Sequence, residues 1–290
     1  MSTPTQPSSL RVVTFNVLPV AYGAVSQWAA RGGHRIELVV TTPGPQSRRT
    51  PSFQGVMNSA ASTVDVLATT RLRKVALPLI RALQPDLIVS FSFPYRIPPE
   101  ICAIPRYGAV NLHPTALPAY RGPNPLRVIY EGYPLLGATL HWTEEEFDTG
   151  RILAQQTASL PANVTPEAVM ALWPPLIMGA LAAGIDQAVA GDPGAEQDHS
   201  QASYGAAFTA EEQWLTPNDT RQVMQRKCTA LNLFGPAAKI RLADQVYQVA
   251  RVDPLDDGQV APPGTRTEQT DQGFTLQVAD GTVRIQATSN

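Results

Sequence analysis

The sequence predicts an α/β protein with a parallel sheet, followed by a smaller domain of antiparallel strands. Over residues 10 to about 185, apolar β-branched segments alternate with helix-like segments, a pattern typical of a parallel sheet covered by helices on both faces. After residue 204, apolar and polar residues alternate, as in half-buried antiparallel strands. A chain of 290 residues also exceeds what one hydrophobic core usually organises. We therefore expect two domains.

The elements of the first domain follow from runs of apolar residues and from turn residues. The first run predicts a strand, and the helix after it ends where Gly32 and Gly33 interrupt the pattern. A later helix presents Val75, Leu79 and Leu83 on one face. In order, we expect a strand at 10–15, a helix around 24–31, a strand at 36–42, a helix at 72–83 and a strand after Asp86.

The second domain is separated from the first by a polar, turn-rich stretch at 191–203 that we interpret as a linker. This divides the chain into a catalytic domain at 1–190 and a second domain at 204–290. A helix is expected at 220–231, followed by antiparallel strands within 238–252 and 273–287 that include a turn at Asp280 and Gly281.

Composition excludes several classes of protein. The formal net charge of −2 argues against a global positive field for nucleic acid. Cys102 and Cys228 lie far apart, so neither a disulfide framework nor a zinc ribbon is encoded, and the four histidines lack metal-ligand spacing. The amino terminus has no export signal, and the most apolar stretch, at 172–185, is short and contains two prolines. We expect a cytoplasmic protein without a metal or a membrane partner; its oligomeric state is left open.

The residues best suited to chemistry lie at the ends of two predicted strands. Asn111 and His113 are two positions apart near the end of a strand, so their side chains point to the same face. Asp148 follows the strand that starts at Gly137. Ligands of open α/β sheets bind beyond the carboxyl ends of the strands. Together the three side chains offer an oxyanion donor, a proton carrier and a carboxylate that orients the imidazole.

Two other interpretations compete with a catalytic cluster. Taken singly, His113 fits a structural histidine and Asp148 fits a turn. The tripeptide Asp148-Thr149-Gly150 also matches the aspartic-protease signature, but that mechanism needs two carboxylates that share a proton, and the motif occurs once.

Three motif blocks in order resemble the folate-dependent formyltransferase family. They are Asn111-x-His113, then Leu117-Pro118-x-Tyr120-Arg121-Gly122, then Asp148-Thr149-Gly150. The two-domain layout and the β-rich end of the chain are also similar to members of this family. The resemblance implies a Rossmann-like catalytic domain, an OB-like β-barrel at the carboxyl end, and formyl transfer from 10-formyltetrahydrofolate to an amine without a metal.

The same resemblance implies the residue roles. Asn111 and His113 would stabilise the oxyanion, and Asp148 would orient His113 and help relay the proton. Residues implied to bind the folate are Phe93, Tyr95, Ile97, Pro98, Glu145, Glu146 and Phe147. Residues implied to contact the acceptor are Phe15, Asn16, Arg121, Gly122 and His141.

Charge is the best sequence evidence on the acceptor. Residues 204–290 hold eight Lys and Arg against ten Asp and Glu, and the early loop around Arg48-Arg49 is only mildly basic. A domain that grips tRNA needs a positive face, so a small-molecule or peptide-like amine is the preferred acceptor. A local patch of Arg221, Arg226, Lys227 and Lys239 keeps formylation of methionyl-tRNA open. Hydrolysis of 10-formyltetrahydrofolate and a silent folate-binding or amine-binding relative are further alternatives.

Overall fold

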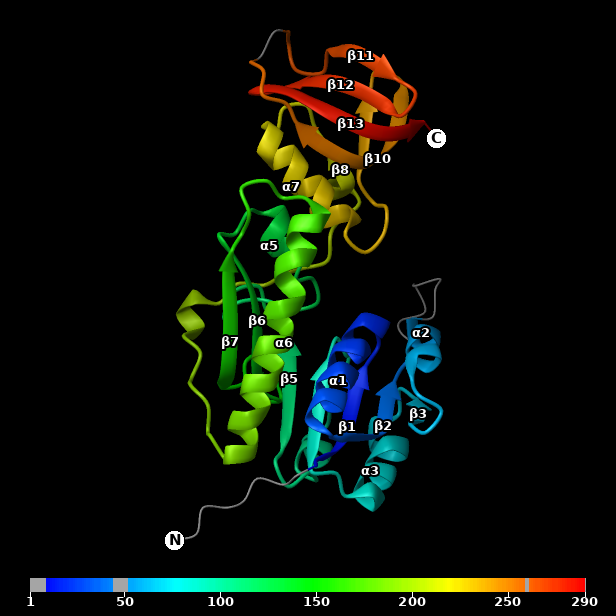
Figure 1. The fold of residues 1–290 in the computed structure, drawn as a ribbon, viewed down its shortest axis with the longest axis vertical. Helices are drawn as coiled ribbons and strands as arrows, with labels where there is room; N and C mark the ends of the chain where they lie inside the picture. Colours follow the sequence, from blue (N-terminus) through cyan, green and yellow to red (C-terminus); the bar gives the residue numbers. More distant parts are fainter. Residues whose placement is uncertain (1–8, 44–51, 259–260, 290) are drawn as a thin grey trace. The chain divides into compact units, whose positions relative to one another are not determined.

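The chain forms two compact units in a computed structural model that describes residues 9–43, 52–258 and 261–289 (Figure 1). Unit 1 comprises Met1–Pro123, Gly137–Thr157 and Pro174–Tyr204, and unit 2 comprises Asn124–Leu136, Ala158–Trp173 and Gly205–Asn290. These boundaries differ from the predicted ones because two segments of the expected catalytic domain belong to unit 2. The expected linker at 191–203 belongs to unit 1. The predicted basic pair Arg48-Arg49 lies outside the described residues.

Unit 1 is built on a seven-stranded sheet with the order β3-β2-β1-β4-β5-β6-β7. Strands β1 to β5 pair in parallel, as predicted, but β6 runs antiparallel to β5, so the sheet is mixed. The bounds are β1 Arg11–Asn16, β2 Arg35–Thr41, β3 Asp65–Ala68, β4 Leu87–Phe91, β5 Ala109–His113, β6 Leu135–Trp142 and β7 Ile152–Ser159. The central strands β1 and β4 are almost wholly buried because helices cover both of their faces.

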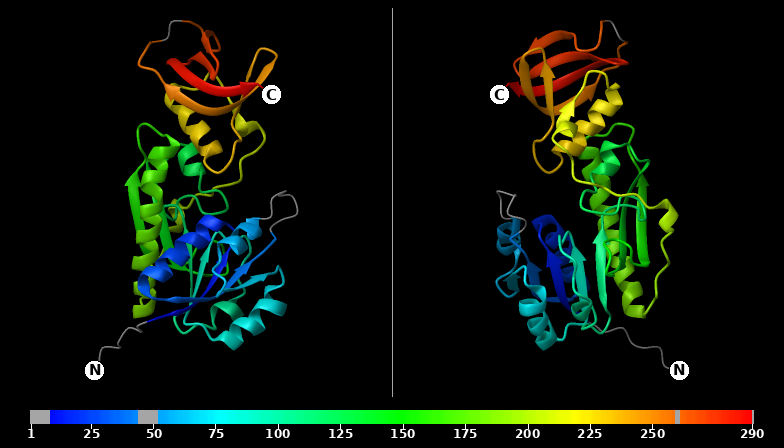
Figure 2. Two further views of the ribbon diagram at one scale, coloured as in Figure 1. Left: turned by 45° about the vertical axis from the view of Figure 1, so that its right-hand side comes forward. Right: turned by 180° about the vertical axis from the view of Figure 1, so that it is seen from behind.

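Alternate residues of β1 serve two separate cores. Val12 packs with α1 (Pro19–Gly32) and with the second half of α6 (Pro166–Ala190). Val13 and Phe15 face the opposite core, with α3 (Leu77–Leu83) and α4 (Pro99–Cys102). This follows from the two-residue period of a strand. The ribbon shows α1 and α3 on opposite faces of the sheet (Figure 2).

The first predicted helix is confirmed in place and extended at its start. Pro19 lies in its first turn, where a missing N–H costs nothing, and Gly33 ends it in the left-handed conformation with φ of 67°. The element predicted at 72–83 is a wide π-helical turn, Leu72–Ala76, followed by α3. Its buried stripe is Leu72, Ala76 and Ile80. The prediction that Leu79 belongs to the apolar face is wrong, because this side chain is 39% exposed.

Helix α6 is longer than the apolar stretch noted at 172–185, and it continues through Pro174 and Pro175. By length and composition alone, it is the one helix among the described residues that could span a membrane. Its apolar residues have a place in the fold, because Leu181 and Ile185 pack with Val110 and Leu140 of the sheet. The helix comes close to β6 at Gly184, where a Cβ atom would lie 2.6 Å from Leu140 Cδ2.

Unit 2 contains a six-stranded sheet with the order β11-β12-β13-β10-β9-β8, and α7 (Arg221–Asn232) packs on it. The bounds are β8 Trp214–Leu215, β9 Lys239–Leu242, β10 Gln245–Pro254, β11 Arg266–Thr270, β12 Gly273–Val278 and β13 Gly281–Ser289. The predicted helix, antiparallel strands and turn at Asp280 and Gly281 are confirmed. No pairing among the described residues joins β8 to β11, so the sheet is not a closed barrel.

Several described elements were not predicted from the sequence. They include α2 (Ser52–Ser59), α4, α5 (Arg127–Tyr130), α6, β3 and β7. In unit 2, α5 is attached by Arg127, whose guanidinium donates to both carboxylate oxygens of Glu212 at 2.6 and 2.8 Å. This ion pair helps to join residues 124–136, which lie between two of the motif blocks in the sequence, to unit 2.

The close approach of α6 to the sheet predicts opposite effects for two glycine substitutions. Gly184→Ala should lower the free energy of unfolding by about 1–3 kcal/mol, because overpacking against Leu140 outweighs the gain in helix propensity. Gly23→Ala in α1 is the matched control. Nothing lies within 4 Å of its added methyl group, so it should stabilise by about 0.5–1 kcal/mol. Urea denaturation midpoints measure both, and equal midpoints for the two variants would contradict the packing argument.

Candidate active site

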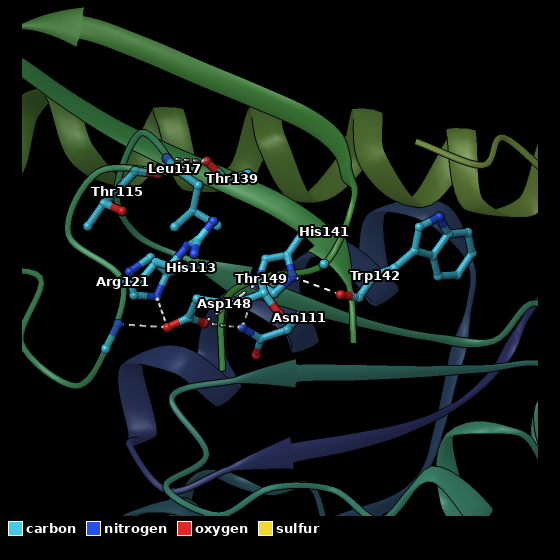
Figure 3. A network of polar contacts seen from close by, with 12 residues as sticks. Asn111, His113, Thr115, Leu117, Arg121, Thr139, His141, Trp142, Asp148 and Thr149 are labelled. Carbon is cyan, nitrogen blue, oxygen red and sulfur yellow. Dashed lines mark hydrogen bonds and ion pairs between the residues drawn. The ribbon is translucent and has the colours of Figure 1, made fainter. Parts of the chain in front are cut away.

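Strand register brings the candidate catalytic residues together. Asn111 and His113 lie on β5, and the antiparallel pairing of β6 with β5 places His141 opposite Asn111. Asp148 lies in the connection between β6 and β7, next to these side chains (Figure 3). The predicted convergence of Asn111, His113 and Asp148 is therefore confirmed as geometry; their catalytic roles stay a prediction.

Asp148 is the centre of this cluster. Asn111 Nδ2 donates to its Oδ1 at 3.3 Å, and the N–H of Gly122 donates to its Oδ2 at 2.8 Å. His113 Nδ1 lies 3.5 Å from Oδ2, and His141 Nε2 lies 3.6 Å from Oδ1. Burial raises the pKa of Asp148, but His113, His141 and Gly122 outweigh it and lower the pKa to about 2. Asp148 is thus a buried carboxylate at neutral pH.

His113 is held in one tautomer by its surroundings. Its Nε2 lies 2.8 Å from the carbonyl oxygen of Tyr120, which can only accept, so Nε2 carries the proton. In the neutral ring, Nδ1 then directs a lone pair at the carboxylate of Asp148. Burial lowers the pKa of His113, opposed by Asp148 and by the Tyr120 carbonyl. The ring is therefore a base whose protonated form already has an acceptor on each side.

His141 is arranged differently. Its Nδ1 lies 2.8 Å from the carbonyl oxygen of Trp142 and donates to it, so Nε2 accepts from Asn111 Nδ2 at 3.1 Å. The side chain is buried within the network. The implied contact of His141 with an acceptor substrate is therefore not supported, and the structure makes this histidine a partner of Asn111.

The two segments implied to bind the folate lie side by side. Arg96 pairs with Glu146 at 2.8 Å, and its guanidinium lies 5.7 Å from the ring centroid of Phe147. Of the implied residues, Tyr95 and Phe147 are exposed by 37% and 45%, and Glu145 and Glu146 are exposed as well. Phe93, Ile97 and Pro98 are buried and support the segment from beneath.

The residues implied to contact the acceptor fall into two groups. Phe15 and Asn16 are fully buried, and Asn16 Nδ2 donates to the Phe91 carbonyl, so their contact with an acceptor stays a prediction. Gly122 and Arg121 lie at the site. The N–H of Gly122 donates to Asp148, and the guanidinium of Arg121 donates to the amide oxygen of Gln197.

Two glutamines that hydrogen-bond to groups next to the site were not predicted from the sequence. Gln197 bonds to the backbone around Asp148, and Gln155 Nε2 donates to the Leu117 carbonyl at 2.8 Å and to Thr139 Oγ1 at 2.9 Å. A lone glutamine in a polar stretch carries no sequence signal for such a role. Within the ranges that the structure describes, no group of three His, Cys, Asp or Glu side chains is arranged to hold a metal ion.

Comparison with known proteins agrees with the motifs. The model of the formyl transferase family matches residues 28–172. The methionyl-tRNA formyltransferase of Roseiflexus sp. (strain RS-1) is 30% identical over 271 residues, 90% of this chain and 82% of that protein. That of Halorhodospira halophila is 30% identical over 172 residues, 59% of this chain but only 55% of that protein.

Among solved structures, the N-formyltransferase from Helicobacter canadensis, in complex with folinic acid and dTDP-3-aminofucose, superposes with a TM-score of 0.68. The match has 14% identity and covers 96% of this chain and 99% of that chain. At this identity the likeness concerns the fold.

The electrostatics of Asp148 predict an acid-dependent contribution to stability. Its folded-state pKa of about 2 lies below the unfolded value of about 3.9, so its stabilisation is complete above pH 5 and is lost as the pH falls through the folded-state pKa. The difference in free energy of unfolding between wild type and Asp148→Asn should shrink by about 2 kcal/mol between pH 5 and pH 2. Urea denaturation at each pH measures it. A difference that does not change with pH would rule out a native carboxylate held by these partners.

Proposed function

This chain belongs to the formyl transferase family, and from that premise we propose that it transfers a formyl group from 10-formyltetrahydrofolate to an amine. The observation that carries the proposal is the cluster of Asn111, His113 and Asp148 at the carboxyl end of β5. In the reaction, the amine nitrogen forms a bond to the formyl carbon and loses a proton. The bond from that carbon to N10 breaks, and N10 gains a proton.

Each side chain of the cluster answers one demand of this reaction. His113 accepts the amine proton at Nδ1 and becomes an imidazolium between Tyr120 and Asp148. Asp148 stabilises that cation, as a carboxylate does for a catalytic histidine. Asn111 exchanges one of its two Nδ2 hydrogen bonds for a bond to the formyl oxygen, where negative charge develops.

The segments beside the cluster fit the formyl donor. Tetrahydrofolate carries a flat ring system, and the exposed rings of Tyr95 and Phe147 offer apolar surfaces of matching kind. Arg96 ties Phe147 and Glu146 to the segment that carries Tyr95. We assign these exposed residues to the donor, and the buried Phe93, Ile97 and Pro98 to their support.

For the acceptor, we propose a small-molecule amine. Three of the four basic residues that could have formed a tRNA-binding patch are engaged within unit 2. Arg221 lies 3.5 Å from Asp280, Arg226 donates to the Tyr130 carbonyl at 3.0 Å, and Lys227 pairs with Asp219 at 2.9 Å. A side chain already neutralised or bound releases fewer counterions on binding a phosphate backbone.

Formylation of methionyl-tRNA is the second candidate. It is favoured by the activity in the names of the sequence relatives, and by Lys239 and Arg241, which lie over Trp214 without an ion pair among the described residues. We also propose that the open sheet of unit 2 is an OB-like, partly open barrel, supported by its antiparallel β9-β10-β13-β12-β11 order.

The role of His113 predicts a large and selective loss. His113→Ala should lower the single-turnover rate of formyl transfer by about a hundredfold or more, with folate affinity little changed, because the imidazole acts mainly in the transition state. His34→Ala is the control, because His34 precedes β2 at the amino ends of the parallel strands. A His113 variant that keeps more than about a tenth of the rate would contradict proton transfer by this residue.

The acceptor is tested by turnover of 10-formyltetrahydrofolate with amino sugars, nucleotide-linked amino sugars or charged initiator tRNA. We expect transfer to a small amine, and tRNA binding that is weak and changes little with salt. Formylation of the methionyl group, with affinity that falls steeply as salt rises, would establish the tRNA alternative. Formate release that needs no amine would indicate a hydrolase, and no turnover under any condition would indicate a silent binding protein.

A further inference from the structure

Gln197 is a buried polar side chain in a segment where the sequence suggests a solvated linker. Its side chain is 5% exposed, and its carboxamide uses its full hydrogen-bonding capacity. Nε2 donates to the carbonyl oxygens of Asp148 at 2.9 Å and Gly150 at 2.7 Å. Oε1 accepts from Arg121 Nε at 3.2 Å and from Nη2 at 2.7 Å.

The orientation of this carboxamide follows from its partners. Carbonyl oxygens only accept and a guanidinium only donates, so the amino group must face Asp148 and Gly150, and the oxygen must face Arg121. The opposite orientation would lose all of these bonds. Gln197 therefore acts as a donor to the loop that carries the site's carboxylate.

The backbone of Asp148 needs such support. Its φ of 58° lies in the left-handed region, which costs a residue other than glycine roughly 1–2 kcal/mol. Gly150, at the other end of the turn, touches β6 so closely that a Cβ atom would lie 1.8 Å from the Trp142 carbonyl oxygen. The turn is thus pressed against β6 on one side and bonded to Gln197 on the other.

The same segment also holds the loop at 118–122, which faces Asp148. Arg121 N donates to the Ser203 carbonyl at 2.9 Å, and Tyr120 N donates to Ser203 Oγ at 2.9 Å. That loop supplies the Tyr120 carbonyl to His113 and the Gly122 N–H to Asp148. Gln197 and Arg121 therefore connect both backbone supports of the catalytic pair.

We propose that Gln197 is a positioning residue for formyl transfer, because its carboxamide holds the Asp148 peptide in the conformation that directs the carboxylate at His113 and Asn111. The inference rests on the proposed function for its link to catalysis. The effect on Asp148 itself is independent of which acceptor the protein uses.

The decisive variants are Gln197→Met, which removes every hydrogen bond, and Gln197→Glu, which keeps an acceptor for Arg121 but removes both donors. Gln201→Met is the matched control, because Gln201 lies in the same segment and is exposed. We expect kcat to fall about tenfold or more in both Gln197 variants, with KM for the folate donor changed less than about twofold. The control should retain wild-type values.

Two further readouts separate positioning from loss of fold. A carboxylate that no longer faces His113 stabilises the imidazolium less, so the acid limb of the pH–kcat profile should move to lower pH by about half a pH unit or more. The pKa of Asp148, followed by the NMR shift of its carboxyl carbon, should rise in Gln197→Met from about 2 toward the ordinary value. A variant that is only less folded lowers kcat equally at every pH and moves neither quantity.

The outcomes are distinguishable. Wild-type turnover with an unmoved acid limb and an unmoved Asp148 pKa in Gln197→Met would overturn the positioning role, as would a Gln197→Glu variant with the wild-type rate. If the wild-type protein transfers no formyl group to any acceptor, the proposed function fails, while the NMR titration still decides whether Gln197 holds Asp148.

Discussion

A charged carboxylate removed from water must be compensated by partners, and this constraint governs the arrangement of unit 1. Asp148 is 8% exposed and ionised, so its charge must be balanced by hydrogen-bond donors and by the imidazole rings beside it. Asn111, Gly122 and His113 each direct a nitrogen at it. Strand β5, the loop at 118–122 and the segment at 197–203 all contribute contacts to this carboxylate or to the backbone that carries it.

The compensation also gives the site its chemistry. Burial lowers the pKa of His113 and the charge of Asp148 opposes that shift, so Asp148 provides a counter-charge whenever the ring is protonated. His141 directs its Nδ1 proton at the Trp142 carbonyl and accepts from Asn111 at Nε2. Two histidines beside one carboxylate thus have separate tasks, set by which ring nitrogen faces a carbonyl.

Local pattern was enough to predict the parallel strands, the first helix and α7, because each depends on neighbours in sequence. The catalytic cluster joins residues as far apart as Asn111 and Asp148, 37 positions, and was predicted from their places at strand ends and from the family resemblance of the motifs. Three features depend on distant contacts and could not be read from the sequence. The reversal of β6, the burial of Phe15 and Asn16, and the wide turn before α3 follow from how the sheet and its helices pack. Gln197 is the extreme case, since its partner Asp148 lies 49 residues earlier in the chain and its neighbours are polar and turn-forming.

Residues 191–204 belong to unit 1, and this affects the position at which two relatives can be joined into a chimaera. A recombination point placed in the turn-rich stretch after α6, where composition invites it, would pair the Asp148 loop of one parent with the Gln197 and Ser203 of another. A crossover after Tyr204 keeps these contacts within one parent. Chimaeras joined at that later point would take every segment of the first unit from one parent, whereas contacts within unit 2 such as Arg127 with Glu212 would then pair residues of two parents.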